Sequence, residues 1–330
     1  MKHRIVICAI VLFIHCQILH AQVRLATLNT VKCRPLALGG AFTTLQDDLP
    51  ALNYNPAGFR VRPNASRYPR AVYLNPLGVG IALANQDALR YGISSAGLII
   101  RGAGIVYGRA HIGLSIGEES FSDIDRIERN DWFDAKGFET QQNVNAGVSF
   151  VLAPKVSLGI VTEIYVRSLK WEHAKAGFRY GIQVKPRPNL TIGLCYVDLP
   201  NQYPQERMVL ERIADETLNV GFQFQPWSWI QTSVDLRNVS DEGKTTEMEP
   251  HTGIEIHPAA PLFLRGGYYQ LKNREEEVFS CGIGLIDGRI VFSRTNLWDR
   301  ITIKLDATMI WQKTHVETYR WMMLSCSIVY

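Results

Sequence analysis

Few residues of this sequence stand at spacings that chemistry requires. Asp47 and Asp48 form an adjacent carboxylate pair, and two carboxylates can serve as general acid and base. The side chains of sequence neighbours usually diverge, so we expect this pair to form helix caps or salt bridges. His251 and His257 fall on one face of a short predicted strand, but six residues apart, which is too far to share a metal ion. The pattern predicts neither an acid–base dyad nor a metal site.

Common catalytic and cofactor-binding motifs are absent as well. The sequence contains no H-E-x-x-H, no G-x-S-x-G, no P-loop and no G-x-G-x-x-G. Cys33, Cys195, Cys281 and Cys326 are widely spaced and form no C-x-x-C, so we expect small apolar thiols rather than a zinc site or a disulfide framework. A hydrolase whose triad is scattered along the chain is the remaining enzymatic alternative. We predict a protein that is not an enzyme and has no cofactor or metal.

The elements that position the polar side chains are strands. In FRYGIQV, residues 178–184, the aromatic and aliphatic side chains occupy one face, and Arg179, Gly181 and Gln183 occupy the other. Four alternating segments of this kind end at a proline, namely Pro154, Pro186, Pro226 or Pro258. In each case the alternation resumes three or four residues later. Proline suits such turns because it lacks the N–H that a ladder would use. The repeat unit is therefore a hairpin.

Fifteen segments alternate in this way. They are 71–84, 90–101, 104–117, 141–153, 155–168, 176–186, 188–199, 216–226, 228–238, 251–257, 261–271, 276–286, 288–296, 301–311 and 318–330. Bacterial barrels of a single chain usually have an even number of strands, so one of these segments is false, and residues 288–317 are the suspect region. We expect about fourteen strands.

Alternation of this kind fits a soluble β-sandwich or a membrane β-barrel, and four features favour the barrel. The strands have about ten residues, enough to cross a bilayer when tilted. Tight turns at the prolines and at Asp287-Gly288 alternate with longer polar connections, such as 118–140. The polar face carries glycine and charges of both signs, and the last strand ends in an aromatic residue, Tyr330. An aromatic girdle would be formed by residues near strand ends, namely Trp227, Trp229, Tyr196, Tyr268 and Trp311.

The N-terminus resembles a secretory signal. Lys2 and Arg4 precede an apolar stretch from Ile5 to Leu19, which is too short and too interrupted for a spanning helix, and cleavage is expected after Ala21. We therefore divide the chain into a signal peptide (1–21), a hatch or plug segment (22–69) and a barrel (70–330). The formal charge of +4 becomes +2 without Lys2 and Arg4, and such a nearly neutral surface does not favour nucleic acid as a partner.

The hatch segment does not alternate. Its run CRPLALGGAFTTLQDDLPALNYNPAGF, Cys33 to Phe59, predicts a short helix ending near Leu52 and several turns. We expect this segment to fill the polar barrel interior, with Asp47 and Asp48 meeting inward arginines such as Arg167 or Arg237. Its marked positions are Gly39, Gly40, Asp47, Asp48, Asn53, Asn55, Pro56, Ala57 and Gly58; the candidate inward-facing charges of the wall are Glu163, Arg167, Arg179, Asp235, Arg237, Glu255 and Arg265.

The run from Arg34 to Phe59, with Asn55-Pro56-Ala57, resembles the N-terminal signature of the PorV/PorQ group of outer-membrane barrels, which is related to the FadL long-chain fatty-acid transporters. The hairpin repeats in 145–270 also resemble that group. The resemblance implies a fourteen-stranded barrel closed by a hatch, in the outer membrane of a Gram-negative-type bacterium, in contact with outer-membrane lipid.

Two roles follow from the resemblance. PorV-like members serve type IX secretion and bind secreted proteins or secretion machinery, which is the expectation adopted here. FadL-like members conduct hydrophobic small molecules, which is the alternative, and a soluble secreted sandwich is a remote one. A possible apolar pocket favours conduction and comprises Phe263, Tyr269, Phe279, Ile283, Leu285 and Trp321; the alternative is that these residues contact the hatch, or that a register slip of one exchanges their faces.

Overall fold

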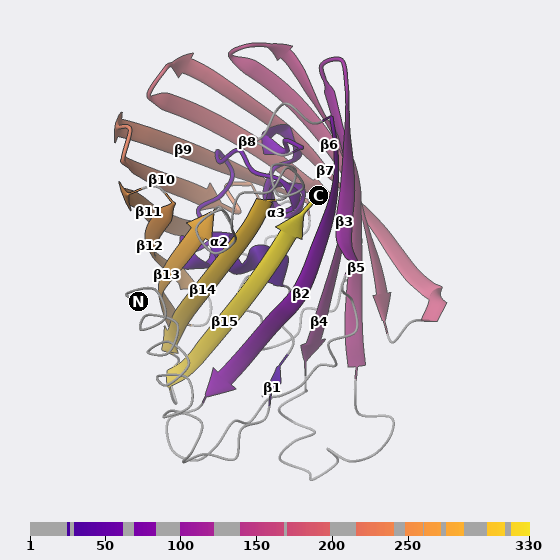
Figure 1. Ribbon diagram of the computed structural model, residues 1–330, viewed down its shortest axis with the longest axis vertical. Helices are drawn as coiled ribbons and strands as arrows, with labels where there is room; N and C mark the ends of the chain where they lie inside the picture. Colours follow the sequence, from indigo (N-terminus) through magenta and orange to yellow (C-terminus); the bar gives the residue numbers. More distant parts are fainter. Residues whose placement is uncertain are drawn as a thin grey trace, which may run out of the picture.

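The computed structural model describes residues 25–26, 30–61, 69–83, 100–121, 139–167, 170–198, 216–240, 248–259, 261–271, 275–286, 302–313 and 318–330. Its strands form one sheet of antiparallel neighbours that curls into a barrel (Figure 1). The sheet closes because β2 (Arg70–Leu83) pairs with β15 (Thr318–Val329) on one side and with β3 (Ile100–Tyr107) on the other. A single closed sheet shows that the sandwich alternative is wrong.

Fourteen strands, β2 to β15, make up the wall, and strands that are consecutive in sequence are neighbours. The others are β4 (Ala110–Phe121), β5 (Glu139–Ala153), β6 (Val156–Arg167), β7 (Lys170–Arg187), β8 (Leu190–Asp198), β9 (Thr217–Trp227), β10 (Ile230–Arg237), β11 (Glu249–Ala259), β12 (Leu262–Leu271), β13 (Glu276–Ile286) and β14 (Thr302–Lys313). A two-residue strand, β1 (Leu25–Ala26), also pairs with β2. The predicted barrel of about fourteen strands is confirmed.

One predicted strand position needs correction. Residues 104–117 were expected to form one strand, but they contain the turn between β3 and β4, where Gly108 has a φ of +59°. Tyr107 pairs with Ala110, so the outward positions change from odd to even residue numbers across this turn, which has no proline to mark it. β13 pairs directly with β14. The strand predicted at 288–296, most of the one at 90–101 and the turn at Asp287-Gly288 lie outside the described residues.

The two faces of the wall differ as the alternation predicts. Along β7, the apolar side chains of Phe178, Tyr180, Ile182 and Val184 point outward and are 37% to 43% exposed. Arg179 and Gln183, on the other face, are buried. A soluble protein would expose little of such a continuous apolar band, whereas lipid would cover it. The outer face is therefore that of a membrane-spanning barrel.

The connections define two ends of the barrel. Five connections of two residues each join strands at one end, which we call the tight-turn end. They are residues 108–109, 154–155, 188–189, 228–229 and 260–261, and this end lies uppermost in Figure 1. Some strands are not spaced as the expected alternation of lengths requires. Only two residues separate β6 from β7 at the opposite end, and fifteen separate β13 from β14 at the tight-turn end.

The hatch lies inside the barrel. Its described part, residues 30–61, contains η1 (Thr30–Lys32), α2 (Cys33–Ala37), α3 (Leu49–Tyr54) and η2 (Pro56–Gly58) (Figure 1). Pro50 and Pro56 stand in the first turns of their helices, where a missing N–H costs nothing. The short helix predicted to end near Leu52 corresponds to α3, whereas α2 was not predicted. No helix in the described part of the chain is long and apolar enough to cross a membrane.

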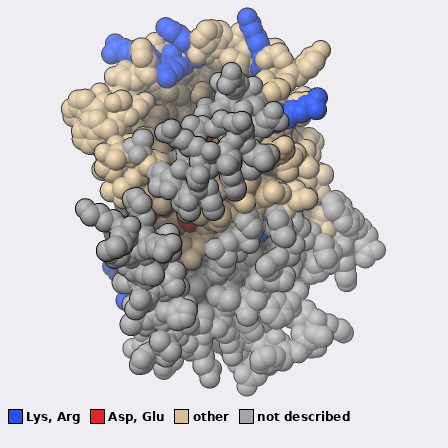
Figure 2. Space-filling view, viewed as in Figure 1, with Lys and Arg blue, Asp and Glu red and all other residues tan. Residues whose placement is uncertain are grey.

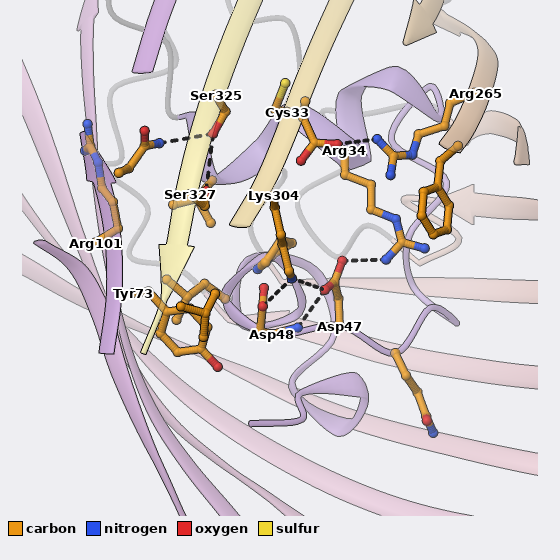
Figure 3. A pocket seen from close by; sticks show the side chains of 18 of the residues that line it. Cys33, Arg34, Asp47, Asp48, Tyr73, Arg101, Arg265, Lys304, Ser325 and Ser327 are labelled. Atoms are coloured by element: carbon orange, nitrogen blue, oxygen red, sulfur yellow. Dashed lines mark hydrogen bonds and ion pairs between the residues drawn. The ribbon is translucent and has the colours of Figure 1, made fainter. Parts of the chain in front are cut away.

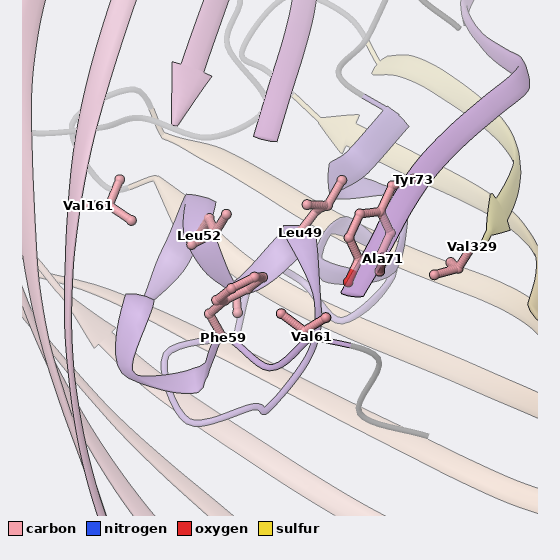
Figure 4. Close-up of a cluster of buried hydrophobic side chains, with 9 residues drawn as sticks. Leu49, Leu52, Phe59, Val61, Ala71, Tyr73, Val161 and Val329 are labelled. Carbon is pink, nitrogen blue, oxygen red and sulfur yellow. The ribbon is translucent and has the colours of Figure 1, made fainter. Parts of the chain in front are cut away.

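Apolar packing joins one side of the hatch to the wall. Leu49, Leu52, Phe59 and Val61 of the hatch form a buried cluster with Ala51 and with wall residues, which are Ala71, Tyr73, Val161 and Val329 (Figure 4). These wall residues come from β2, β6 and β15. Burial of this apolar surface stabilises the hatch against those strands, at roughly 25 cal/mol per Å² removed from water.

Candidate functional site

The Asn55-Pro56-Ala57 element fastens the hatch to the wall. The Asn55 Nδ2 group donates to the carbonyl oxygens of Thr43 at 2.7 Å and of Leu194, in β8, at 3.2 Å. The Asn55 Oδ1 atom accepts from the N–H of Ala57 at 3.0 Å and so caps η2. One buried amide thus joins two parts of the hatch to a strand.

A second contact holds the loop from Gly39 to Thr43. Gly39 and Gly40 have φ values of +61° and +73°, which favour glycine. The Asp235 Oδ2 atom accepts from the backbone N–H groups of Phe42 and Thr43, both at 2.8 Å. Two further wall residues form hydrogen bonds to the glycines. Arg237 Nη2 donates to Gly40 O at 2.5 Å, and His251 Nδ1 donates to Gly39 O at 2.6 Å.

A cavity of about 360 Å³ lies between the hatch and the tight-turn end of the wall (Figure 3). Its polar lining comes from the hatch and from β2, β3, β10, β11, β12, β14 and β15, and includes Arg34, Asp47, Asp48, Arg101, Glu255, Arg265, Lys304 and Asp306. Leu49, Tyr73, Phe263 and Val329 add apolar surface. The cavity is therefore a mixed, strongly charged space.

Ion pairs in this cavity link hatch to wall. Arg34 contacts Asp47, also in the hatch, at 2.5 Å and Glu255 of β11 at 2.8 Å. Glu255 also accepts from Arg265 Nε at 2.7 Å. The charges alternate in sign along this chain of contacts, as buried charges require.

Lys304 of β14 completes the link. Its Nζ group contacts Asp48 directly and lies 3.6 Å from Asp47 Oδ1 (Figure 3). Asp306, two residues along the same face, contacts Arg265 Nη1 at 2.5 Å. Both hatch carboxylates are thus held by cations, but one cation belongs to the hatch and the other to a strand near the C-terminus.

The two carboxylates differ in acidity. Burial alone would raise the pKa of Asp47, but the charges of Arg34 and Lys304 outweigh it and lower that pKa to about 2. Burial raises the pKa of Asp48 to about 6, with Lys304 opposing the rise and Asp47 adding to it. Asp47 is a permanent anion, whereas Asp48 changes charge in mildly acidic solution.

The cysteines offer no nucleophile near this cavity. Burial raises the pKa of Cys33 to about 12, so its thiol stays protonated, and its Sγ atom lies 3.2 Å from Thr308 Oγ1. Cys195 is also buried, Cys281 is exposed and Cys326 is partly buried, and all four are free thiols. Within the described residues, no group of three or more His, Cys, Asp or Glu side chains could hold a metal ion.

The structure brings most of the marked inward charges to the hatch or to one another. Glu163 and Arg179 form a buried pair at 2.7 Å. Asp235 and Arg237 hold the glycine loop, and Glu255 and Arg265 belong to the cavity network. Arg167 is the last residue of β6, and its side chain lies outside the described part.

The side chain of Arg167 lies outside the described part, so its expected contact stays a prediction, but the expectation that Arg237 meets Asp47 and Asp48 was wrong. Arg34 and Lys304 hold them, whereas Arg237 reaches Gly40 and lies over the ring of Tyr54 at 5.4 Å. Arg34 stood in the quoted hatch sequence and was overlooked. Lys304 and Asp306 could have been found from the alternation in ITIKLDA, since both occupy its polar face.

The predicted apolar pocket divides between two faces. The prediction is wrong for Phe279, Ile283 and Leu285. These side chains point outward and are 48%, 53% and 38% exposed. The inner face of β13 carries Gly282 and Gly284 instead, where a Cβ atom would meet Ala37 at 2.6 Å and the Arg265 guanidinium at 2.6 Å. The hatch and its ion pairs thus leave no room there for large side chains.

Three members of that set do face inward. Phe263 lines the cavity, with the guanidinium of Arg265 5.5 Å from its ring. Tyr269 is buried and stacks on His251 at 4.4 Å. Trp321 is buried and donates through Nε1 to Gln312 at 3.1 Å. Of the three, only Phe263 lines the cavity.

Comparisons with known proteins agree on the fold. The CymD monoaromatic hydrocarbon channel matches with a TM-score of 0.58 at 10% identity, over 92% of this chain and 97% of that one. A Pseudomonas aeruginosa FadL homologue gives 0.55 at 14% identity, over 92% and 98%. The Pseudomonas putida toluene transporter TodX gives 0.54 at 10% identity, over 94% and 98%.

At these identities the likeness establishes a shared fold. No protein-family model matches the chain, and no curated protein sequence matches it. The structural likeness is to FadL-type barrels, and nothing in the comparisons supports the expected resemblance to the PorV/PorQ group.

Proposed function

We propose that this protein is an outer-membrane channel for hydrophobic small molecules. The observation that carries the proposal is a barrel whose axis is filled by a firmly held hatch, in the same fold as a monoaromatic hydrocarbon channel and a toluene transporter. Hatch and wall touch so closely that a Cβ atom added to Gly159 would lie 2.3 Å from Pro56. A hydrated solute has no straight path through such an interior.

The wall itself supports a sideways path. Among the described residues, β2 pairs with β3 only from Arg70 to Leu74, near the tight-turn end. Farther along β2, Gly80 and Ile81 pair with the short β1. β3 is described only from Ile100, which is opposite Leu74, so the described β2–β3 seam is short. A seam with few ladder hydrogen bonds is where an apolar molecule would pass between the lumen and lipid at the lowest cost.

Uptake by whole cells tests the proposal. Cells that lack their own channels for hydrophobic compounds would express the full chain, and initial uptake of radiolabelled toluene would be compared with that of a polar sugar. We expect faster toluene uptake than in cells with the empty vector, and unchanged sugar uptake. Equal toluene uptake in both strains would contradict the proposal.

A cross-linked variant tests the seam. Ala26 and Gly80 are register partners, so the double variant Ala26→Cys/Gly80→Cys has Cα atoms at a distance that suits a disulfide. Oxidation should slow toluene uptake, and a reductant should restore it. Wild type, in which the four cysteines of the described residues are free, is the control and should not respond. If large secreted proteins cross-link to the barrel and toluene uptake stays at the vector level, secretion would be the better interpretation.

A further inference from the structure

The tight-turn end of the barrel is basic. Five exposed cations stand at or beside its turns: Arg70, Arg109, Lys155, Lys185 and Arg187. None of the ion pairs within the described residues involves them. No acidic side chain occurs among the described turn residues of this end. Figure 2 shows the resulting blue side chains along the upper edge of the molecule.

Backbone hydrogen bonds fix these turns relative to one another. Arg109 O accepts from Val151 N at 2.9 Å, which joins the first turn to the β5–β6 hairpin. Lys155 O accepts from Lys185 N at 2.7 Å, which joins that hairpin to the next. Three neighbouring turns therefore hold their cations in a fixed row, which we call the basic arc, together with Arg70 and Arg187.

Aromatic residues mark the depth of this end in the membrane. Tyr107 is 78% exposed and Tyr330 is 54% exposed. Trp227 and Trp229, in the β9–β10 hairpin, are 60% and 49% exposed and stack with ring centroids 5.7 Å apart. Exposed Tyr and Trp at the edge of an apolar band gather at the level of the lipid headgroups. The basic arc lies at the same level.

Among the described residues, the cations are also unevenly placed around the rim. The β9–β10 and β11–β12 hairpins have no Lys or Arg in or beside the described part of their turns, whereas each of the three hairpins from β3 to β8 has at least one there. Cations spaced evenly around the rim would serve general solubility. A one-sided arc beside lipid-facing side chains such as Val184 instead favours a bound partner that is anionic and lies in the membrane plane.

We propose that the basic arc binds anionic phospholipid headgroups of the leaflet that surrounds the tight-turn end. Lys and Arg side chains would contact the phosphates, while the neighbouring outward side chains contact the acyl chains. This site is separate from the lumen and does not depend on what the channel conducts.

Lipid retention by the purified full chain tests this site. The protein would be placed in nanodiscs of equal phosphatidylglycerol and phosphatidylcholine, returned to mild detergent, and its retained lipids measured by mass spectrometry. We expect phosphatidylglycerol to exceed phosphatidylcholine, and the excess to fall with salt. The variant Arg109→Gln/Lys155→Gln/Lys185→Gln/Arg187→Gln should bind phosphatidylglycerol at least tenfold more weakly, since each membrane-proximal cation contributes roughly fivefold.

Two control variants separate charge from folding. Lys313→Gln/Arg320→Gln removes exposed cations from the opposite end and should keep the preference. Lys155→Arg/Lys185→Arg keeps the charges and should also keep the preference for phosphatidylglycerol. Heat-modifiable gel migration would verify that every variant is folded.

Three results would overturn the proposal. They are equal retention of the two lipids by wild type, an equal loss in the opposite-end control, and displacement of phosphatidylglycerol by millimolar inorganic phosphate, which would indicate a simple anion site. Tighter binding of an acidic polyglutamate peptide than of phosphatidylglycerol would likewise reject the lipid in favour of a protein partner.

Discussion

Asp47 and Asp48 are adjacent in sequence, yet their surroundings separate them chemically. Asp47 has two cations within 4 Å, at 2.5 and 3.6 Å, whereas Asp48 contacts Lys304 alone among the described ion pairs. Both carboxylates are buried, so the second cation decides which of them ionises at low pH. The pair therefore combines a fixed charge with a titratable one at the junction between hatch and wall.

The titration of Asp48 gives a prediction with a definite sign. Its pKa in the folded protein, about 6, is above its usual value, so the protonated form favours folding. Stabilisation is present at pH 4 and is lost as the pH rises through 6. The melting temperature of wild type minus that of Asp48→Asn should therefore fall between pH 4 and pH 7, as measured by circular dichroism in detergent.

Asp47→Asn is the matched control for that experiment. The folded pKa of Asp47, about 2, is below its usual value, so its contribution is present throughout pH 5 to 7 and is lost only towards pH 2. The difference between wild type and Asp47→Asn should be constant from pH 5 to 7. Parallel curves for the two variants would contradict the assigned surroundings.

Glycines on the inner faces of the strands are the main packing device at the level of elements. A Cβ atom at Gly267 of β12 would lie 2.0 Å from the backbone nitrogen of Gly39, and one at Gly181 of β7 would lie 2.0 Å from Asn55 Oδ1. The crowded interior inferred from glycine on the polar face is therefore crowded by the hatch. Strand and hatch backbones approach each other because no side chain intervenes.

Neighbouring glycines of β12 provide a second prediction. Gly267→Ala should displace the hatch loop and lower the free energy of unfolding by roughly 1–3 kcal/mol, because the three nearest atoms all belong to the backbone. Gly266→Ala is the control, since its new Cβ atom would be 3.5 Å from the nearest atom. Hydrogen exchange of the hatch amides should rise in the first variant only. Equal exchange in both would mean that hatch and β12 are not in close contact.

The errors in strand assignment have a local cause. The β3–β4 turn at Gly108 has no proline to mark it, and the outward positions change there from odd numbers, such as Ile105, to even numbers, such as Ile112; a single strand over 104–117 overlooks this change. In β13, large apolar residues alternate with Gly282 and Gly284, and size alone does not say which set faces the lumen. The pairing of Arg265 with Gly282 across β12 and β13 decides it.

At the scale of the whole molecule, the barrel inverts the usual distribution of residues. Asp235, His251, Glu255 and Glu163 are 0% to 1% exposed inside it, while aromatic and aliphatic side chains cover the outside. This arrangement is stable only if lipid contacts the outer band and the hatch satisfies the inner charges.

The outer band gives a third prediction. Ile283→Arg should destabilise the barrel in lipid vesicles by roughly 1–4 kcal/mol, depending on depth, because it places a charge against acyl chains. Ile283→Leu should be nearly neutral. Guanidinium titration followed by heat-modifiable migration measures both. If the Ile283→Arg barrel were as stable as wild type, Ile283 would face the lumen, as the apolar pocket predicted from the sequence requires.

The sequence by itself determined the class of fold, because period-two alternation, strand length and hairpin turns are local properties of the chain. Alternation marked fifteen segments, and the even number usual for barrels reduced them to about fourteen strands. The sequence also marked the hatch as the segment that does not alternate, and most of the inward charges.

Only the tertiary structure decided how these parts meet. Lys304 reaches Asp48 across 256 residues, and Asn55 reaches Leu194 across 139. Such contacts depend on where the hatch sits after the barrel closes, and no local pattern encodes that position. The inward face of β13 is likewise set by what fills the lumen, since alternation defines two faces but the packing around the hatch chooses between them.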